Sequence, residues 1–433
     1  MILMHRKQDK QRKMKEQRPV YHFTPSSNWM NDPNGLIYFG GRYHLFYQHF
    51  PYAPVWGRMH WGHAVSSDMV NWEYLPIAVF PSKSYDLDGV FSGSAIEIDG
   101  RINFYYTAIH YRDYNPENTN LCGNLGFEAN QAVITSVDGF SFDHFNDKKI
   151  AVPMLTDTSL GSDVHTRDPK VWKYKDRYYM VLGSRFGKDG MGEKAESFTP
   201  ELLFYTSEDG FSWEYKNRAV MNEDYGFMWE CPDVFTVNGE TVAVFSPQGI
   251  MEKPQTDLAC FGIVDFDNDS CEMKLSKEKM RPVDFGLDYY APQSFTDKDG
   301  RRVQIGWLRM KKPRTDMNGT EWIGCYTIPR VVTAENGKIF TRPHPNLREK
   351  FEVFDSVQPG RSVYCIKKAL NIGESIDIGG YVLRRTEDSL TALRDGTEYS
   401  APCEGLCEVE IYIDNCVIET YINDGEAVIS HVI

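Results

Sequence analysis

The sequence lacks any apolar run approaching the roughly 18 residues that a membrane-spanning helix needs. Its opening residues, Met1-Ile2-Leu3-Met4, are too few for the apolar part of a secretory signal. Basic charge is also scarce, because 61 Asp and Glu against 47 Lys and Arg give a formal net charge of −14. This balance argues against an extended nucleic-acid surface. We predict a soluble, cytoplasmic protein with neither a membrane nor a nucleic-acid partner.

Cysteine spacing provides no disulfide framework and no metal site. The nine cysteines are odd in number and scattered between Cys122 and Cys416. Cys403 and Cys407 lie close together in the sequence, but no matching His or Cys cluster accompanies them. We therefore expect no metal and no other cofactor.

Aromatic residues are abundant, and they favour a β protein. Tyr, Phe and Trp make up 14% of the chain, a composition typical of strands and of sugar-binding surfaces. Segments with the periodicity of amphipathic helices are almost absent. At 433 residues the chain exceeds the size at which one core usually stops growing, so two domains are expected.

A short motif, Ser-x-Asp-x-x-x-aromatic, occurs three times at intervals of about 70 residues, which indicates a repeated supersecondary unit. The copies are Ser66–Trp72, Ser136–Phe142 and Ser207–Trp213.

Five segments consist of an apolar strand, a Gly, Asn or Asp turn and a second apolar strand, which is a hairpin signature. They are Leu36–Tyr47, Ser94–Thr107, Val171–Gly183, Val234–Ser246 and Ser294–Leu308. Five hairpins with little helix between them favour five radial antiparallel blades over a sandwich or a barrel. We predict an all-β fold in which a five-bladed β-propeller comes first.

The pattern changes after about Arg348, where shorter strands alternate with Asn, Asp and Gly turns. About 80 residues suit a small β-sandwich, and the chain ends at Ile433 soon after Asn423-Asp424-Gly425, so the sandwich is expected to be short. The predicted boundaries are a basic N-terminal tail at 1–20, the propeller at 21–340, a linker at 341–352 and the sandwich at 353–433.

Carboxylates stand near the start of three of the five predicted blades. They occur in Asn31-Asp32-Pro33, in Arg167-Asp168-Pro169 and in Trp229-Glu230-Cys231-Pro232-Asp233. Equivalent positions of successive blades converge on a propeller axis, so the three acids are expected at equivalent positions facing one funnel. Each acid alone could simply cap its own turn, and Asn31–Gly35, within WMNDPNGL (Trp29–Leu36), is turn chemistry throughout. Together they suit a glycosidase, which needs one ionised and one protonated carboxyl group.

These motifs also carry a resemblance. Trp29–Gly35, Phe91-Ser92-Gly93-Ser94-Ala95, Arg167-Asp168-Pro169 and Glu230-Cys231-Pro232-Asp233 resemble, in order, the signature motifs of glycoside hydrolase family 32, which includes invertases, fructanases and sucrose-6-phosphate hydrolases. The likeness runs from about Tyr21 to Arg330. It implies a five-bladed propeller followed by a β-sandwich, the architecture that the hairpin count also predicts.

The resemblance implies that Asp32 is the nucleophile, Asp168 the transition-state stabiliser and Glu230 the acid/base. Beside Arg167, Asp168 is expected to stay ionised. The positions that the resemblance places around the fructosyl unit, or within the motif of the nucleophile, are Trp29, Met30, Asn31, Gln48, Trp56, Phe91, Ser92, Arg167, Tyr290 and Trp307.

The leading hypothesis is a retaining β-fructofuranosidase that acts on sucrose, sucrose-6-phosphate or a short fructan. Two enzymatic alternatives keep the same site, a fructan exo-hydrolase and a fructosyltransferase that passes fructose to a sugar acceptor. A carbohydrate-binding propeller without catalysis is the non-enzymatic alternative. The basic loop residues His110, Arg112, Arg185 and Lys188 do not by themselves define a phosphate site.

Overall fold

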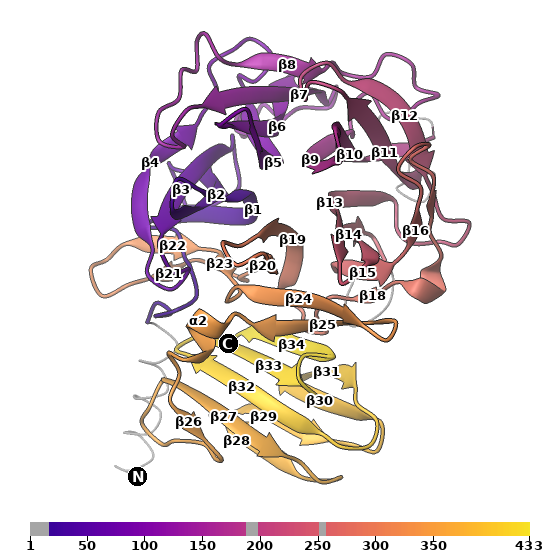
Figure 1. Ribbon diagram of the computed structural model, residues 1–433. Coiled ribbons are helices and arrows are strands. Elements are labelled where there is room, and N and C mark those ends of the chain that lie inside the picture. Colours follow the sequence, from indigo (N-terminus) through magenta and orange to yellow (C-terminus); the bar gives the residue numbers. More distant parts are fainter. Residues whose placement is uncertain (1–16, 188–197, 251–256) are drawn as a thin grey trace.

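The computed structural model describes residues 17–187, 198–250 and 257–433. Antiparallel sheets account for most of this part of the chain, as Figure 1 shows. Its only helical segments are the short helix α2 (Pro345–Arg348) and the 3-10 turn η2 (Lys277–Lys279). The all-β prediction is confirmed. Most of the predicted N-terminal tail, residues 1–16, and Lys188 lie outside the described residues. No helix within the described ranges is long and apolar enough to cross a membrane.

Five sheets make up the larger part of the molecule. Sheet 1 has the order β21-β22-β1-β2-β3-β4, with β1 (Asn28–Phe39), β2 (Arg42–Phe50), β3 (His60–Ser66), β4 (Glu73–Val79), β21 (Arg314–Thr315) and β22 (Glu321–Ile323). Sheet 2 contains β5 (Gly89–Ile98), β6 (Arg101–Tyr111), β7 (Phe127–Ser136) and β8 (Lys149–Val152). Sheet 3 contains β9 (Arg167–Tyr174), β10 (Arg177–Phe186), β11 (Thr199–Ser207) and β12 (Glu214–Ala219).

Sheets 4 and 5 complete this part. Sheet 4 contains β13 (Met228–Val237), β14 (Glu240–Gln248), β15 (Cys260–Ile263) and β18 (Arg281–Pro282), and a small ribbon of β16 (Asp265–Phe266) and β17 (Met273–Lys274) lies between its last two strands in sequence. Sheet 5 contains β19 (Tyr289–Thr296), β20 (Arg302–Leu308), β23 (Cys325–Tyr326), β24 (Arg330–Glu335) and β25 (Lys338–Pro343).

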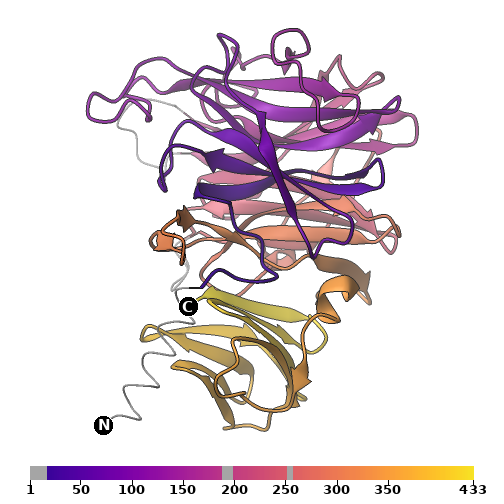
Figure 2. The same cartoon turned by 90° about the vertical axis from the view of Figure 1, so that its left-hand side faces the viewer.

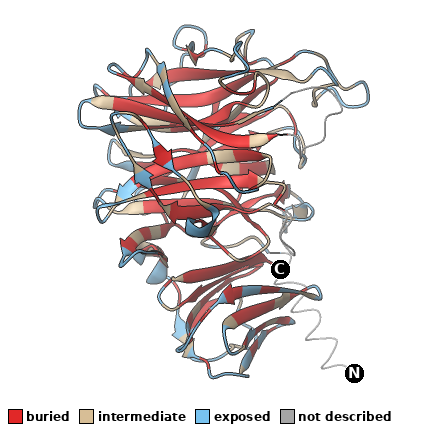
Figure 3. Cartoon of the chain, turned by 90° about the vertical axis from the view of Figure 1, so that its right-hand side faces the viewer, coloured by how far each residue is buried: buried red, intermediate tan, exposed pale blue. Residues whose placement is uncertain are grey.

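The strand of each sheet that comes first in the sequence lies next to a common axis (Figure 1). These five inner strands are β1, β5, β9, β13 and β19. Strand β1 contacts β5, β5 contacts β9, β9 contacts β13, β13 contacts β19, and β19 returns to β1. Figure 3 shows that burial is continuous along the sheet interiors, while exposed residues gather at the turns.

Buried polar side chains join each of these inner strands to the next, so that the contacts form a closed belt around the axis. The contacts are Gly93 N to Asn34 Oδ1 at 3.0 Å, Ser94 Oγ to Pro169 O at 2.8 Å, Lys170 Nζ to Asp233 Oδ2 at 3.2 Å, Ser294 Oγ to Asp233 Oδ2 at 2.7 Å, and Leu36 N to Gln293 Oε1 at 3.2 Å. Because the groups are buried or, at Gln293, partly buried, and all are paired, separating any two sheets would leave polar groups without partners.

The repeated sequence motif forms one turn in each of the first three sheets. Asp68 follows β3, Asp138 follows β7 and Asp209 follows β11, and each carboxylate accepts two backbone N–H groups of its own turn. The five predicted hairpins are confirmed as the first two strands of the five sheets.

Two further sheets follow α2 and lie below the five sheets in Figure 2. One has the order β26-β27-β32-β33-β34, with β26 (Val353–Phe354), β27 (Val363–Ala369), β32 (Glu408–Asp414), β33 (Val417–Ile422) and β34 (Ala427–Val432). The other contains β28 (Ser375–Ile378), β29 (Tyr381–Arg385), β30 (Ser389–Arg394) and β31 (Thr397–Pro402). They share one apolar core, which includes Ile366, Ile378, Leu390, Ile411 and Ile429.

A buried ionic cluster connects the C-terminal sheets to the rest of the molecule. Arg330 Nη2 of sheet 5 lies 2.6 Å from Glu419 Oε2 and 2.9 Å from Asp284 Oδ2. His22, near the start of the described chain, contacts Asp414 through Nδ1 at 2.8 Å and Glu419 through Nε2 at 3.0 Å. These side chains are fully buried, so the two parts share a polar interior.

Candidate active site

The candidate site is created by one irregularity that recurs in all five inner strands. The pairing register breaks between Met30 and Pro33, between Val90 and Gly93, between Glu230 and Asp233, and between Tyr290 and Gln293, and β9 breaks register with β10 after Arg167. Four of these breaks contain a proline, which has no N–H to give to a ladder. Such bulges turn the neighbouring side chains out of the sheet, and here they turn toward the axis.

Three residues at these breaks adopt positive φ angles, namely Asp168 at 65°, Cys231 at 47° and Ala291 at 46°. Each precedes a proline. Such backbone costs of order ~1–3 kcal/mol per residue and persists only where surrounding contacts hold it.

The register corrects one expectation about the acids. Glu230 is the last paired residue before its break, as Met30, Arg167 and Tyr290 are before theirs. Asp168 is the first residue inside its break, and Asp32 is the second inside its own. The expectation of three carboxylates at equivalent positions was therefore wrong, because by the pairing register each acid occupies a different position.

Asp32 is partly buried and lines the site. Its Oδ2 accepts a hydrogen bond from Ser92 Oγ at 2.6 Å, and the thiol of Cys231 lies 3.5 Å from the same oxygen. Burial raises the pKa of Asp32 to about 6, with the Ser92 hydrogen bond lowering it and the charge of Glu230 raising it. Asp32 is thus a carboxyl group that titrates close to neutral pH.

Asp168 is held from two sides. Its backbone N–H donates to Thr107 Oγ1 at 2.8 Å, and its Oδ2 accepts from the backbone N–H of Cys231 at 2.9 Å. Burial raises its pKa, Arg167 opposes this, and the charges of Glu230 and Asp32 add to the rise. Arg167 therefore offsets the burial of Asp168 only in part, and the pKa of this carboxyl group stays above its usual range.

Arg167 has only a partial effect on the pKa of Asp168 because it binds a different carboxylate, that of Glu230. Its Nη2 and Nε lie 2.7 Å and 3.2 Å from Oε1 of Glu230, whereas its closest approach to Asp168 is 3.9 Å. The other carboxylate oxygen of Glu230 accepts from the hydroxyl of Tyr290 at 2.7 Å. Arg167 and Tyr290 are the register equivalents of Glu230, so the three side chains meet from neighbouring inner strands.

The three acids line one cavity of about 340 Å³. The predicted residues that also line it are Asn31, Gln48, Trp56, Phe91, Ser92 and Arg167. Trp56 is about one third exposed and meets Phe91 edge to face at 5.7 Å, so its ring stands at the mouth. The apolar rings offer faces to a sugar, and the acids offer acceptors for its hydroxyl groups.

Four predicted residues lie beside or beneath the cavity. Trp29 donates its ring N–H to Asn31 Oδ1 at 2.8 Å and packs on Trp307 at 6.1 Å. Trp307 also meets the ring of Tyr290 at 6.5 Å. Met30 is fully buried in the apolar core, so its side chain is not available to a ligand. The prediction that Met30 contacts the substrate was therefore wrong.

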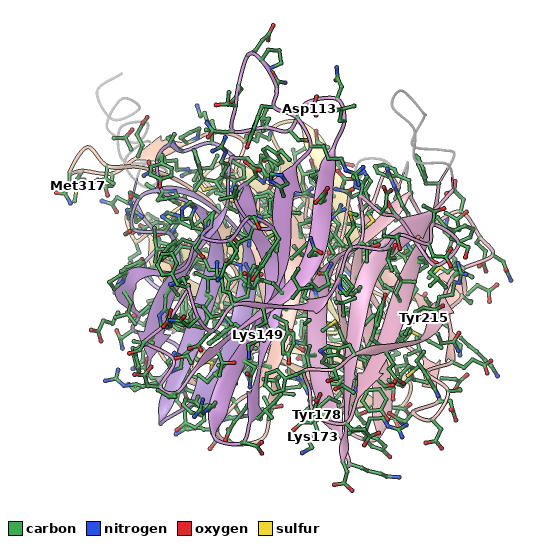
Figure 4. The ribbon with its side chains drawn as sticks, turned by 90° about the horizontal axis from the view of Figure 1, so that it is seen from above. Asp113, Lys149, Lys173, Tyr178, Tyr215 and Met317 are labelled. Carbon is green, nitrogen blue, oxygen red and sulfur yellow. The ribbon has the colours of Figure 1, made fainter. Side chains whose placement is uncertain are left out.

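Five residues that the sequence reasoning did not select also line the cavity: Tyr111, Cys122, Phe127, His165 and Gln248. His165 could have been found from its place two residues before Arg167, whose Nη1 lies 3.3 Å from His165 Nδ1. Tyr111 and Phe127 flank the loop that carries Cys122, a loop without a local motif. Figure 4 shows Asp113 of this loop at the opposite end of the sheets from Lys173 and Tyr178 of the β9–β10 hairpin.

Comparison with known proteins adds three findings. The model of the glycosyl hydrolases family 32 N-terminal domain matches residues 22–343. A sucrose-6-phosphate hydrolase and a raffinose invertase, both of Escherichia coli, are each 31% identical to this chain, and each alignment covers 95% of this chain and 88% of the relative. A solved structure of a mutant Bombyx mori family 32 β-fructofuranosidase in complex with sucrose is 28% identical, with a TM-score of 0.75, over 99% of this chain and 93% of that one.

Proposed function

The chain belongs to glycoside hydrolase family 32, and from this premise we propose that it is a retaining β-fructofuranosidase that hydrolyses sucrose or sucrose-6-phosphate. The observation that carries the proposal is the meeting of Asp32, Asp168 and Glu230 on one cavity. Buried acids that raise one another's pKa destabilise a fold, so their convergence needs a chemical reason.

In the first step, the ionised Asp32 attacks the anomeric carbon of the fructosyl unit. The glycosidic bond breaks, and Glu230, which must first take up a proton because it rests as the ion-pair partner of Arg167, gives that proton to the departing oxygen of the glucosyl group. The products are an ester between fructose and Asp32 and the free glucose or glucose-6-phosphate. Cys231 and Ser92 flank the attacking carboxylate and orient it.

In the second step, water enters from the side that the glucosyl group has left. Glu230 removes its proton, the oxygen bonds to the anomeric carbon, and the ester bond to Asp32 breaks. Two displacements on the same carbon return its original configuration. Asp168 accepts hydrogen bonds from the sugar hydroxyls, and these strengthen as positive charge develops on the ring.

The proposal extends to architecture and location. The five sheets are the five blades of a β-propeller at residues 21–340, the two sheets at 353–433 form a β-sandwich, and residues 341–352 link them. The closed belt of polar contacts between five successive inner strands supports this reading. A cytoplasmic location suits a phosphorylated substrate that uptake delivers inside the cell.

The two Escherichia coli relatives with the same identity have names that point to different substrates, so the substrate is best settled by kinetics. We expect kcat/KM to be highest on sucrose or sucrose-6-phosphate and much lower on inulin, the substrate that a fructan exo-hydrolase would prefer. Free fructose and the glucosyl product should appear in equal amounts. A fructosyltransferase would instead release less free fructose than glucosyl product, because it passes fructose to a sugar acceptor. Binding of sucrose without turnover would contradict the proposal and favour a carbohydrate-binding propeller.

A further inference from the structure

Two buried residues of sheet 2 reach across to the backbone that carries Asp168. Thr107 of β6 and Gln131 of β7 lie directly opposite each other in the ladder and are 0% and 1% exposed. Thr107 Oγ1 accepts from Asp168 N at 2.8 Å and donates to Gln131 Oε1 at 2.9 Å. Gln131 Nε2 donates to Thr166 O at 3.0 Å. The two side chains therefore hold the chain on both sides of Arg167.

The direction of every hydrogen bond in this network is fixed. The hydroxyl of Thr107 has one proton, and because it accepts from the amide of Asp168, that proton goes to Gln131. If the Gln131 amide were turned over, its oxygen would face the carbonyl oxygen of Thr166, and two acceptors would oppose each other. Only one arrangement of donors and acceptors satisfies all four groups.

This network gives the backbone amide of Asp168 the hydrogen-bond partner that it lacks within sheet 3. At the register break Arg167 pairs with Gly183 and Lys170 pairs with Val181, so the amide of Asp168 has no partner in the ladder. Asp168 also has a φ of 65°, which needs outside contacts to persist. The break in β5 between Val90 and Gly93 lies opposite Thr107, and the Thr107 hydroxyl is 3.5 Å from Ser92 O.

We propose that Thr107 and Gln131 are positioning residues that hold the Arg167-Asp168 peptide so that the Asp168 carboxylate meets the fructosyl unit in the transition state. This inference rests on the proposed function, since it assigns the network to the same site. Neither Thr107 nor Gln131 lines the cavity. Both act through Asp168, whose backbone amide is bound by the Thr107 hydroxyl. A carboxylate that stabilises developing charge loses much of its effect when it is displaced by about 1 Å.

The test compares Thr107→Val, which keeps the shape and removes the hydroxyl, with Thr107→Ser, which keeps the hydroxyl. Thr107→Val should lower kcat on sucrose by roughly 10- to 100-fold with KM changed by less than about threefold, because the ground-state contacts remain. Thr107→Ser should restore kcat to within about threefold of the unmodified enzyme. Gln131→Met should lower kcat in the same direction, and combining it with Thr107→Val should add little, since the two act as one unit.

Thr135→Val is the matched control. Thr135 donates to Asn103 at 2.7 Å across the same two strands, but four residues farther along β7. It should lower the melting temperature without changing kcat at 25 °C. Equal losses of kcat in Thr107→Val and Thr135→Val, or an unchanged kcat in Thr107→Val, would overturn the positioning role. If Thr107→Val does not fold, Gln131→Met decides by the same criterion. An unmodified enzyme that cleaves no β-fructoside would instead refute the proposed function.

Discussion

Arg167 forms an ion pair with Glu230, 63 residues later in the chain, at 2.7 Å from Nη2 to Oε1. Its own neighbour Asp168 is 3.9 Å away. The guanidinium thus binds Glu230, the proposed proton donor. Asp168 instead accepts a hydrogen bond from the backbone N–H of Cys231. In the resting site the two carboxylates are distinguished by their partners, one by a cation and the other by an amide.

Arg167→Lys should lower kcat/KM on sucrose by roughly 100-fold. A lysine ammonium cannot place two N–H groups on Glu230 and reach His165 as the guanidinium does, so Glu230 loses its fixed position. Steady-state kinetics measure the change. Arg112→Lys is the control, because Arg112 forms a more exposed ion pair with Asp163, and it should stay within about twofold. Similar losses in both variants would contradict this role for Arg167.

Activity should fall as pH falls through about 6. Burial raises the pKa of Asp32 to about that value, and only the ionised form can attack, so kcat/KM should drop about tenfold per pH unit below it. Ser92 donates to the charged carboxylate at 2.6 Å and lowers the pKa. Ser92→Ala should therefore move the acid limb of the profile to higher pH. A limb centred near 4, or one unmoved by Ser92→Ala, would exclude Asp32 as its source.

Asp32→Asn should inactivate the enzyme and stabilise its fold. The folded pKa of about 6 lies above the unfolded value of 3.8, so ionisation at pH 7 costs stability, roughly 1–3 kcal/mol after allowance for partial exposure. The gain should shrink below pH 6 and vanish below about 4, where both states are protonated.

Thermal unfolding at pH 7 and pH 4 tests this gain. Asp138→Asn is a control of opposite sign, since its carboxylate accepts two turn N–H groups that hold its pKa low. It should lose stability at pH 7. A melting temperature of Asp32→Asn below that of the unmodified protein at pH 7 would contradict the pKa assignment.

The buried contact of His22 with Asp414 and Glu419 should make the fold sensitive to alkali. Burial lowers the pKa of His22, but the two carboxylates outweigh it and raise the pKa to about 9. The charged histidine therefore contributes its full stabilisation, roughly 2–3 kcal/mol, below about pH 6.5, and this is lost as pH rises through 9. The difference in unfolding free energy between the unmodified protein and His22→Gln should shrink between pH 6.5 and pH 10.

His344→Gln is the matched control for this titration. His344 also contacts a carboxylate, Asp297, at 3.1 Å with both side chains buried, but burial lowers its pKa. Its contribution should not change between pH 7 and pH 10. If the effect of His22→Gln is equally constant over that range, His22 is neutral in the fold.

Local chemistry explains why much of the fold was predictable. The aspartate carboxylates of the Ser-x-Asp turns bond within their own turns, and that of Asp68 accepts from residues two and three positions later. Asp-Pro and Cys-Pro pairs mark the breaks in the inner strands because proline leaves a ladder unpaired whatever surrounds it. Such features can be read from a short stretch of sequence.

The contacts between neighbouring sheets could not be predicted in this way. The partner of the Asp168 amide is Thr107, 61 residues earlier, and the partner of Arg167 is Glu230, 63 residues later. Neither pair has a local signature, and the different register positions of the three acids depend on where each strand breaks its pairing. Adjacent Arg167 and Asp168 suggested an ion pair, but the strand geometry directs the guanidinium to the next sheet.

The leaving group of the substrate separates the proposed roles of Glu230 and Asp32. Glu230→Ala should lower sucrose cleavage by roughly 10²- to 10⁴-fold, because the glucosyl oxygen then departs without a proton. An aryl fructoside with an activated phenol needs little protonation, so its first step should be much less affected and should appear as a burst of phenol. Asp32→Ala should abolish cleavage of both substrates, since no ester can form whatever group departs.

Rapid-mixing measurements of phenol release, with sucrose hydrolysis assayed in parallel, distinguish these outcomes. Glu230→Gln is a useful companion variant, since it keeps the volume and the contact with Tyr290 but has no proton to donate at neutral pH. It should behave as Glu230→Ala does on both substrates. Equal loss of aryl fructoside cleavage in the Glu230 and Asp32 variants, or a phenol burst that survives Asp32→Ala, would show that the nucleophile and the acid have been assigned wrongly. In that case Asp32 would be no more than a residue of the register break in β1.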